Sequence, residues 1–443
     1  MNKIDEFKGM KALVRLSGPI FVELFLQMLV GNVDQFMVGR YSDVGVAAIG
    51  NANQVLNIVI IVFSVISIAA TIRISLYKGY GDHEKAQSLY TLSLCVNLLL
   101  SIIVSIVLVV FSKLIFTLMN VPEEVLPQAA LYLSLIGGFI FLQGIHLTFT
   151  AILRSNAMMK ESMLVSLVLN IVNIGGNALL IPYFGLTGAA ISSIAARFAG
   201  VIILAVIFKL KVDGRISLKY LKPFPWEQLK KLLCIGLPSG GESFSYTVSQ
   251  LAIQTMANGF GKGVIVTKTY ASMFAMISYL YTNALSQASQ IIVGYLLGAG
   301  DENNVRAQVK RTVTLSILVS LIISIIIFLC SRQIFGFFTD NQQIIELGHT
   351  IMLLDIFVEL GRAVNMVMVR DLQAVGDIAF PIILGITCMW LIATLGGFVL
   401  GIGFNMGLAG FWIAMACDEC LRAVMFIVRW KSGKWKGKNL ISE

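Results

Sequence analysis

Charged residues are scarce in this chain. They make up 13% of its 443 residues, whereas hydrophobic residues make up 57%, and an ordinary soluble domain carries about a quarter charged residues. This deficit excludes an ordinary soluble protein. The apolar residues form runs of about 20, the length that crosses the hydrocarbon core of a membrane as a helix. Membrane β-strands would instead give shorter, alternating segments.

The residue types of common catalytic motifs are also few. The three histidines, His83, His146 and His349, stand far apart, so there is no HExxH and no histidine beside a nucleophile. The chain has no GxxxxGK[ST] phosphate loop. Cys417 and Cys420 form a single CxxC without a second pair of ligands, which indicates structural thiols rather than zinc. We therefore expect no enzyme activity and no cofactor.

A formal net charge of +9 is compatible with nucleic acid binding. A nucleic acid binder would carry its basic residues on a soluble domain, however, and this chain has none. Breaks at glycine, proline and charge divide the apolar residues into twelve spans, centred near residues 27, 62, 100, 138, 172, 198, 242, 280, 319, 357, 391 and 416. The fold class is therefore all-α, a polytopic membrane protein of twelve transmembrane helices.

The distribution of Lys and Arg predicts the orientation in the membrane. With both termini in the cytoplasm, inside segments hold 26 of these residues and outside loops hold four. The positive-inside rule then predicts a multi-pass protein of the cell membrane with both termini cytoplasmic. The charged amino end leads directly into the first span without a cleavage site, so we expect no removable signal peptide.

One linker divides the chain. Residues 209–231 are basic and contain two prolines, so we predict an amino-terminal bundle at 1–208 and a carboxy-terminal bundle at 232–443. The second bundle ends in a basic tail, RWKSGKWKGK, in which Lys and Trp are interspersed. That composition predicts a tail that lies among anionic lipid headgroups.

The two halves repeat each other at an offset of 219 residues. Pro19 matches Pro238, Glu23 matches Glu242, and the turn GYGD at 79–82 matches GAGD at 298–301. Farther along, a shift of three restores the match between 184–190 and 406–412. Six spans per repeat predict two pseudo-symmetric six-helix bundles that enter the membrane in the same direction, with Pro19 and Pro238 as hinges. The GxGD turns are typical of helix caps rather than phosphate loops.

Several segments together resemble the multidrug and toxic compound extrusion (MATE) family of the MOP flippase superfamily. They are LSGPIFVELFLQMLVGNVDQFMVGR in the first span, the GxGD turn, AILRSNAMMK after the fourth span, NIVNIGGNALLI in the fifth, GLTGAAISS before the sixth and IGLPSGGE opening the seventh. The resemblance covers all twelve spans. It implies a secondary antiporter that exports small organic compounds in exchange for H⁺ or Na⁺ by a rocker-switch motion.

Ionisable residues inside spans are functional candidates because each costs at least about 2.5 kcal/mol in the bilayer. Asp34 lies fifteen residues after Pro19, about 22 Å farther along the helix. A buried carboxylate there can exchange a proton or a cation. The resemblance gives Asp34 the coupling role, and capping of the helix end is the alternative.

Polar residues of the fifth and sixth spans complete this candidate site. Asn173 and Asn177 lie one helical turn apart and can face one cavity. They resemble the fifth-span pair of the family's ion site, and Ser193 occupies the place of a hydroxyl there. Asp34, Asn173 and Asn177 would be the metal ligands if the ion is Na⁺, although Asn177 stands where many relatives carry Asp, which weakens the case for sodium. The alternative is ordinary hydrogen bonding between helices.

Arg197 follows Ser193 by one turn, at a position where the family pattern has an uncharged side chain. We predict that it pairs with Asp34 when the carboxylate is ionised and releases it on protonation. A structural ion pair with Glu23 is the alternative.

The second half holds the predicted substrate-binding residues. Glu242 follows Pro238 as Glu23 follows Pro19, and some family members place this acid at the position of Tyr246 instead. The candidates are Glu242, Tyr246, Lys268, Glu359 and Arg362, of which the last two are three residues apart and are predicted to pair. Together with Asp355 these residues make the second half polar. Zwitterionic or anionic substrates are therefore alternatives to cationic ones.

Two other functions compete with the exporter. A lipid-linked oligosaccharide flippase of the same superfamily would typically carry an arginine-rich cavity and extra spans, whereas Asp34 with Asn173 and only twelve spans favour the exporter. A channel is disfavoured by the proline bends and the repeat. We expect a monomer whose partners are a small-molecule substrate and membrane lipid.

Overall fold

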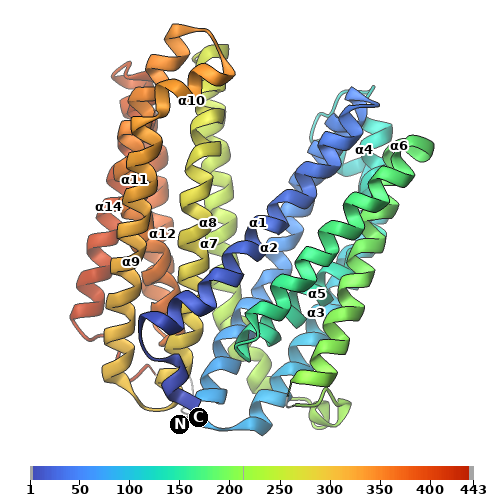
Figure 1. The fold of residues 1–443 in the computed structure, drawn as a ribbon, viewed down its shortest axis with the longest axis vertical. Helices are drawn as coiled ribbons and strands as arrows, with labels where there is room; N and C mark the ends of the chain where they lie inside the picture. The colour runs from blue at the N-terminus through green and yellow to red at the C-terminus, as the bar shows by residue number, and fades with distance from the viewer. Residues whose placement is uncertain (1–2, 213, 439–443) are drawn as a thin grey trace. The chain divides into compact units, whose positions relative to one another are not determined.

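A computed structural model of the chain describes residues 3–212 and 214–438 (Figure 1). Over these residues it contains helices and no β-strand. The helices of the first half are η1 (Lys3–Phe7), α1 (Gly9–Gly39), α2 (Asp43–Tyr80), α3 (His83–Leu118), α4 (Leu126–Gly138), α5 (Phe141–Ser155) and α6 (Met159–Lys211). Those of the second half are η2 (Leu218–Leu221), α7 (Trp226–Asn258), α8 (Lys262–Gly298), α9 (Glu302–Leu329), α10 (Ser331–Phe338), α11 (Gln342–Ala374), α12 (Ala379–Cys388), η3 (Met389–Thr394), α13 (Leu395–Phe398), η4 (Val399–Gly403) and α14 (Gly407–Lys431).

The described helices make twelve passages, which confirms the predicted number of spans. α4 and α5 form one passage bent by 49°, and the π-helical segments η3 and η4 interrupt the passage from α12 to Gly403. By length and composition alone, six of the described helices, or seven with the bent pair, are apolar enough to cross a membrane. That count is lower because α6 holds two passages and because α7, α8, α11 and α14 fail the test. Uncharged polar residues and glycines, together with ionisable residues, lower the mean hydropathy of these four helices.

Helix α6 is a hairpin of two spans rather than one long helix. In a straight helix, Asn173 and Ser193 would stand about 30 Å apart, yet Asn173 Nδ2 donates to Ser193 Oγ over 3.0 Å. The chain reverses at Gly185, whose φ of 55° and ψ of −130° are not helical. Glycine tolerates this conformation because it has no Cβ, and Pro182 withholds a backbone donor from the turn before it.

The two arms of α6 approach closely at Gly176, which has no side chain. A Cβ on Gly176 would lie 2.4 Å from Ser192 Oγ, which is far inside van der Waals contact. Ser192 in turn donates to the backbone oxygen of Asn173 over 2.8 Å. This contact sets the spacing between the arms that carry Asn173 and Ser193.

Contacts divide the described chain into two compact units. One comprises residues 22–240, and the other comprises the described residues up to 21 together with those from 241 onward. These units differ from the predicted ranges 1–208 and 232–443, because α1 and α7 each contribute to both. The division in each helix falls three residues after Pro19 and Pro238, the residues predicted as hinges.

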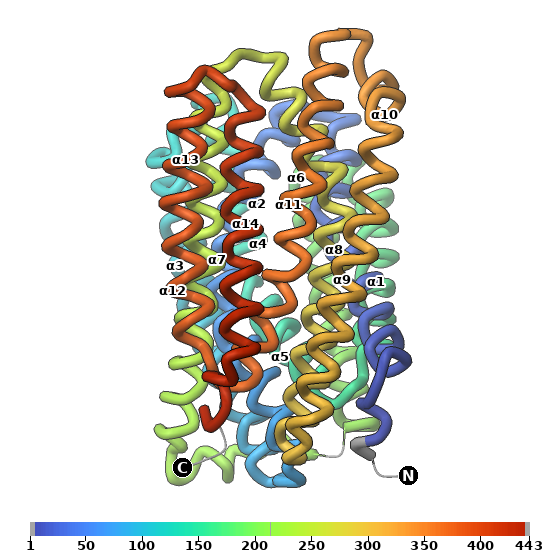
Figure 2. Tube along the Cα trace, turned by 90° about the vertical axis from the view of Figure 1, so that its left-hand side faces the viewer, coloured from blue at the N-terminus to red at the C-terminus, as the bar shows by residue number. Residues whose placement is uncertain are grey.

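Within each unit, helices pack around a few central elements. In the unit of residues 22–240, α2 packs against α3, α4 and α5, and α6 packs against α4 and α5. In the other unit α11 is central and contacts α8, α9 and α14 (Figure 2). Both functional regions described below are built on these central helices.

The carboxy-terminal tail folds back onto protein at Trp435, Lys436 and Lys438, whereas Lys431 and Lys434 are exposed. Trp435 is 2% exposed and stacks on Trp430 with ring centroids 4.6 Å apart. Lys438 and Arg429 both donate to the buried Asp377 carboxylate in the loop before α12, with Arg429 Nε 2.7 Å from Oδ2. Lys436 pairs with Glu302 at the start of α9. The binding of the tail to lipid headgroups stays a prediction.

Gly176→Ala tests the close approach within α6. The added methyl group must displace Ser192, so we expect a loss of about 1–3 kcal/mol of stability, measured by thermal unfolding in detergent. Gly175→Ala is the matched control, because a Cβ at Gly175 meets no atom within 4 Å. Equal melting temperatures for the two variants would contradict the packing described here.

The tail contact is expected to weaken in acid. Burial by itself raises the pKa of Asp377, but hydrogen bonds from Arg429 and Lys438 and their charges outweigh it and hold the pKa below the ordinary value. The stabilisation is therefore complete above the unfolded pKa of about 4 and is lost as the pH falls through the lower folded pKa. Asp377→Asn removes roughly 2 kcal/mol at neutral pH, which hydrogen exchange of the tail amides measures. Exchange as slow as in the parent would contradict the contact.

Candidate functional site

The first candidate site surrounds the Asp34 carboxylate in the unit of residues 22–240. Asn173 Nδ2 and Asn177 Nδ2 donate to Oδ1 over 3.1 and 2.6 Å, and Ser193 Oγ donates to Oδ2 over 2.7 Å. Tyr132 OH lies 3.5 Å from Oδ2. All five side chains are at most 3% exposed. We refer to Asp34, Tyr132, Asn173, Asn177 and Ser193 as the Asp34 site.

Four chain segments assemble the Asp34 site, of which α4 carries Tyr132. Asp34 comes from the second half of α1, the asparagines from the first arm of α6, and Ser193 from its second arm. Asn173 and Asn177 share a helix face because they are four residues apart. The hairpin at Gly185 then brings Ser193 to the opposite side of the carboxylate. The structure thus brings together the four residues that the sequence grouped, and it excludes a mere helix cap for Asp34, which is surrounded by other helices.

Tyr132 was not predicted as a site residue. It lies on α4, is 3% exposed and sits among apolar residues of the core. A tyrosine in an apolar run is most often a packing residue, so the sequence carried no signal that its hydroxyl reaches Asp34.

Arg197 lies near the Asp34 site without being bonded to it. It acts electrostatically on Asp34 and Tyr132, but over the described chain it forms no salt bridge, and its Nη1 is buried without a hydrogen-bond partner. The predicted alternative partner, Glu23, pairs with Arg154 over 2.9 Å and accepts from Ser162. The ion pair with Glu23 is therefore wrong for this structure, and the switching role of Arg197 stays a prediction.

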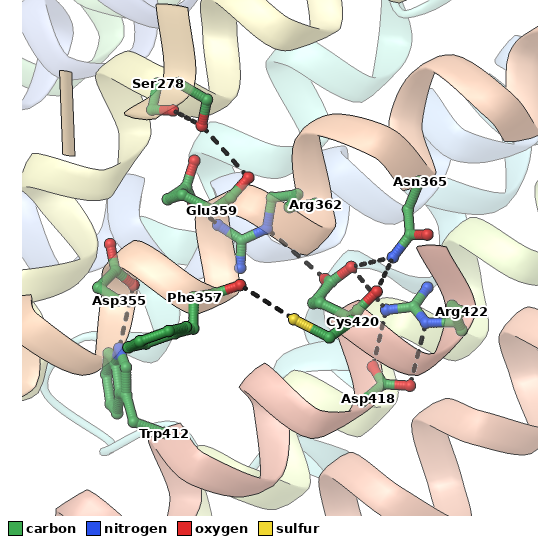
Figure 3. A network of polar contacts seen from close by, with 12 residues as sticks. Ser278, Asp355, Phe357, Glu359, Arg362, Asn365, Trp412, Asp418, Cys420 and Arg422 are labelled. Carbon is green, nitrogen blue, oxygen red and sulfur yellow. Dashed lines mark hydrogen bonds and ion pairs between the residues drawn. The ribbon is translucent and has the colours of Figure 1, made fainter. Parts of the chain in front are cut away.

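The second candidate site is a chain of charged residues between α11 and α14, which we call the α11–α14 network (Figure 3). Arg362 pairs with Glu359, as predicted, and its Nε lies 3.6 Å from Glu419 Oε1. Arg422 donates two hydrogen bonds to Asp418 over 2.7 and 3.0 Å and pairs with Glu419 over 3.0 Å. Its members are Asp355, Glu359, Arg362, Asn365, Asp418, Glu419 and Arg422.

Neutral donors complete this network. Asn365 Nδ2 donates to the side chain of Glu419 over 2.6 Å and to its backbone oxygen over 2.8 Å. Trp412 Nε1 donates to Asp355 Oδ1 over 3.0 Å. If every group is ionised, four carboxylates face two guanidinium groups. In that state the network carries an excess of negative charge in a buried position.

Two of the other predicted substrate-binding residues interact electrostatically with this network, and the third does not. Glu242 lies against Gly385 of α12 and acts electrostatically with Arg422. Tyr246 is 37% exposed and interacts electrostatically with Arg362 and Glu419. Lys268 on α8 is 7% exposed and forms no salt bridge or hydrogen bond with any described residue, so the structure does not join it to the network.

The sequence missed the contribution of the last helix. Asp418, Glu419 and Arg422 of α14, and their partner Asn365 of α11, were not singled out, although all four are buried. A usable signal was present. Acids three and four residues before an arginine inside an apolar span predict pairs on one helix face.

The sequence of this chain is similar to that of a known family. A family model described as MatE matches the chain twice, over residues 19–179 and 238–399. The chain belongs to the MATE family. The two matches begin at Pro19 and Pro238, 219 residues apart, which confirms the internal repeat. As a MATE transporter, the protein is a multi-pass membrane transporter for small molecules and not an enzyme.

Relatives span nearly the whole MATE chain. It is 32% identical over 435 residues to the uncharacterized transporter YisQ of Bacillus subtilis (strain 168), covering 97% of this chain and 96% of that one. It is 27% identical over 439 residues to the probable multidrug resistance protein NorM of Thermotoga maritima, covering 98% and 94%.

Solved structures share the fold. A MOP superfamily transporter from Pyrococcus furiosus Vc1 (DSM3638), described as having a binding pocket of reversed polarity, matches with a TM-score of 0.90 at 20% identity over 99% of both chains. A crystal structure of MATE in the bent conformation matches with a TM-score of 0.91 at 20% identity, covering 99% of this chain and 98% of that one.

Removing one charge from the α11–α14 network is expected to destabilise the protein strongly. Arg422→Met leaves Asp418 and Glu419 buried without their shared partner, which costs about 3–5 kcal/mol. Arg332→Met is the control, because Arg332 and Glu346 form an exposed pair worth about 0.2–1 kcal/mol. Thermal unfolding of both variants in detergent measures the difference, and comparable losses would contradict a buried network.

Proposed function

We propose that this MATE protein is a secondary antiporter that exports small organic compounds in exchange for protons, with Asp34 as the proton-carrying residue. The observation that carries the proposal is the Asp34 site, a single carboxylate that is 3% exposed and surrounded by hydrogen-bond donors. A buried carboxylate changes its protonation state only when its surroundings stabilise both forms.

The surroundings of Asp34 suit both forms. When Asp34 is ionised, two asparagine amides, a serine and a tyrosine hydroxyl stabilise the charge, and Arg197 contributes a nearby positive charge. When Asp34 is protonated, the hydroxyl of Ser193 or Tyr132 can rotate and accept its hydrogen, because a hydroxyl is both donor and acceptor. Protonation then removes the attraction to Arg197, which gives the proton a means to alter the packing of α1 against the second arm of α6.

The same geometry favours a proton over sodium as the coupling ion. The Asp34 site holds one carboxylate, and the described part of the chain has no cluster of three or more His, Cys, Asp or Glu residues that could hold a metal ion. The nitrogens of Asn173 and Asn177 point at the carboxylate over 3.1 and 2.6 Å, whereas a hard cation requires oxygen ligands. Sodium coupling would need both amides to turn.

The proposal also covers the hinges of the transporter, its orientation in the membrane and the charge of its substrates. Pro19 and Pro238 lie where α1 and α7 pass from one packing unit to the other, which supports hinges at these positions. The positive-inside distribution supports cytoplasmic termini in the plasma membrane. The excess acid of the α11–α14 network, with Glu242 and Tyr246 beside it, supports selection of positively charged substrates in the second bundle.

Transport into proteoliposomes tests the function. With an imposed pH gradient and a cationic dye such as ethidium, we expect Asp34→Asn to fall to the rate of protein-free liposomes, since an amide cannot exchange a proton at the carboxylate. Asp43→Asn is the control, because Asp43 is an exposed carboxylate at the start of α2 and should transport like the parent.

Two other outcomes would reject this assignment. Dye movement driven by a sodium gradient at constant pH would mean that sodium, and not the proton, is the coupling ion. Movement of a lipid probe without any gradient would replace the antiporter with a flippase.

A further inference from the structure

The second bundle contains a buried carboxylate outside the α11–α14 network. Asp371, one turn before the end of α11, is 0% exposed and lies 2.9 Å from Ser289 Oγ of α8. Ser289 Oγ lies 3.1 Å from Thr312 Oγ1 of α9, and Thr312 Oγ1 lies 3.0 Å from the backbone oxygen of Gln308. Three helices thus contribute to one line of oxygen atoms that begins at Asp371.

No opposite charge reaches this carboxylate. Over the described residues Asp371 forms no salt bridge, and its Oδ1 is buried without a hydrogen-bond partner. Both polar atoms of the Gln308 side chain, one turn before Thr312 on the same face of α9, are also buried without partners. An ionised carboxylate in such surroundings is costly, because neither water nor a counter-charge stabilises it.

No charged group on the surrounding helices forms a salt bridge with Asp371 over the described residues. On α14, Arg422 binds Asp418 and Glu419, and Arg429 binds Asp377. On α9, Arg306 lies over the Trp435 ring, and Lys310 and Arg311 are exposed. Arg370 precedes Asp371 on α11, and its backbone oxygen accepts from Gln290 of α8. On α8 itself, Tyr295 stacks on Phe7, and Lys268 lies 21 residues before Ser289, about 30 Å away along the helix.

The hydroxyl groups can satisfy Asp371 in two directions, because each carries one hydrogen and accepts others. If Asp371 is protonated, it donates to Ser289, Ser289 donates to Thr312, and Thr312 donates to the backbone oxygen of Gln308. If it is ionised, Thr312 donates to Ser289 and Ser289 donates to the carboxylate, but Oδ1 then keeps negative charge without a donor. The protonated form is the one in which every hydrogen has an acceptor and no buried charge remains.

We propose that Asp371, Ser289 and Thr312 form a second proton-binding site, separate from the Asp34 site, whose proton holds α8, α9 and α11 together. The oxygen atoms already stand at hydrogen-bond distances, which leaves no room between them for a metal ion. Loss of this proton leaves a buried negative charge that this end of the bundle can relieve only by opening to water.

The repeat shows that the scaffold does not require an acid here. At the offset of 219 residues, Asp371 corresponds to Ile152, Ser289 to Ala70 and Gln308 to Leu89, all of which are 0% exposed. Thr312 corresponds to the buried Ser93, which donates to the backbone oxygen of Leu89. The first bundle therefore keeps this hydroxyl and has apolar side chains at the other three positions. A carboxylate in the second bundle adds a titratable group that packing alone does not explain.

Infrared spectroscopy of the full-length protein detects the proton without any transport assay. In an Asp34→Asn background at neutral pH, we expect the C=O band of protonated carboxyl groups, and we expect its intensity to fall by the contribution of one carboxyl in Asp34→Asn/Asp371→Asn. The matched control is Asp34→Asn/Asp340→Asn, because Asp340 is exposed, and it should keep the band. Identical spectra for the three proteins would overturn the site.

The pH profile of transport separates a titrating proton from a merely structural one. Asp371→Asn keeps the size of the side chain and resembles the protonated acid at every pH. In an otherwise unaltered chain it should therefore extend transport to higher pH than the parent. An unchanged alkaline limb would overturn the role of this proton in holding the bundle. The infrared readout is independent of whether Asp34 is the coupling residue, because that comparison is made without Asp34.

Discussion

A carboxylate removed from water needs hydrogen-bond donors, an opposite charge or a proton, and this requirement organises the interior of both bundles. Each remedy occurs at a different place in the chain. Asp34 is surrounded by neutral donors, Glu23 and Asp418 have arginine partners, and Asp371 has two hydroxyl groups in line. The positions of these groups explain why particular helices must lie side by side, since a missing partner would leave a buried charge.

The repeat supplies one scaffold that the two halves fill with opposite charges. In the register shifted by three, Arg197 of the first bundle corresponds to Glu419 of the second, and at the offset of 219 His146 corresponds to Asn365. Asn365 donates to Glu419 over 2.6 Å, and His146 lies within electrostatic range of Arg197. Equivalent positions on equivalent helices thus meet in both bundles. One bundle gains a positive centre near a single acid, and the other gains a negative network.

This difference in charge suits the two bundles to different roles in transport. A single carboxylate with neutral donors can gain or lose one proton without rearranging a larger set of ion pairs. The α11–α14 network has more acids than arginines, so it retains attraction for a positive charge even with both guanidinium groups paired. The proposed division, with coupling in the first bundle and substrate selection in the second, would use one scaffold with different side chains.

Local sequence patterns determined the helices, the twelve spans, the repeat and the grouping of Asp34 with Asn173, Asn177 and Ser193. These features follow from apolar length, glycine and proline breaks, helical spacing and family motifs, all of which are readable along the chain. Only the tertiary structure showed three contacts. Tyr132 lies beside Asp34, Glu23 pairs with Arg154, and Arg362 lies beside Glu419. Those contacts connect residues 50 or more positions apart, and their geometry depends on how α4, α6, α11 and α14 pack. The burial of Trp435 was decided in the same way, because a Lys and Trp pattern is equally suited to lipid headgroups and to acidic partners on a folded surface.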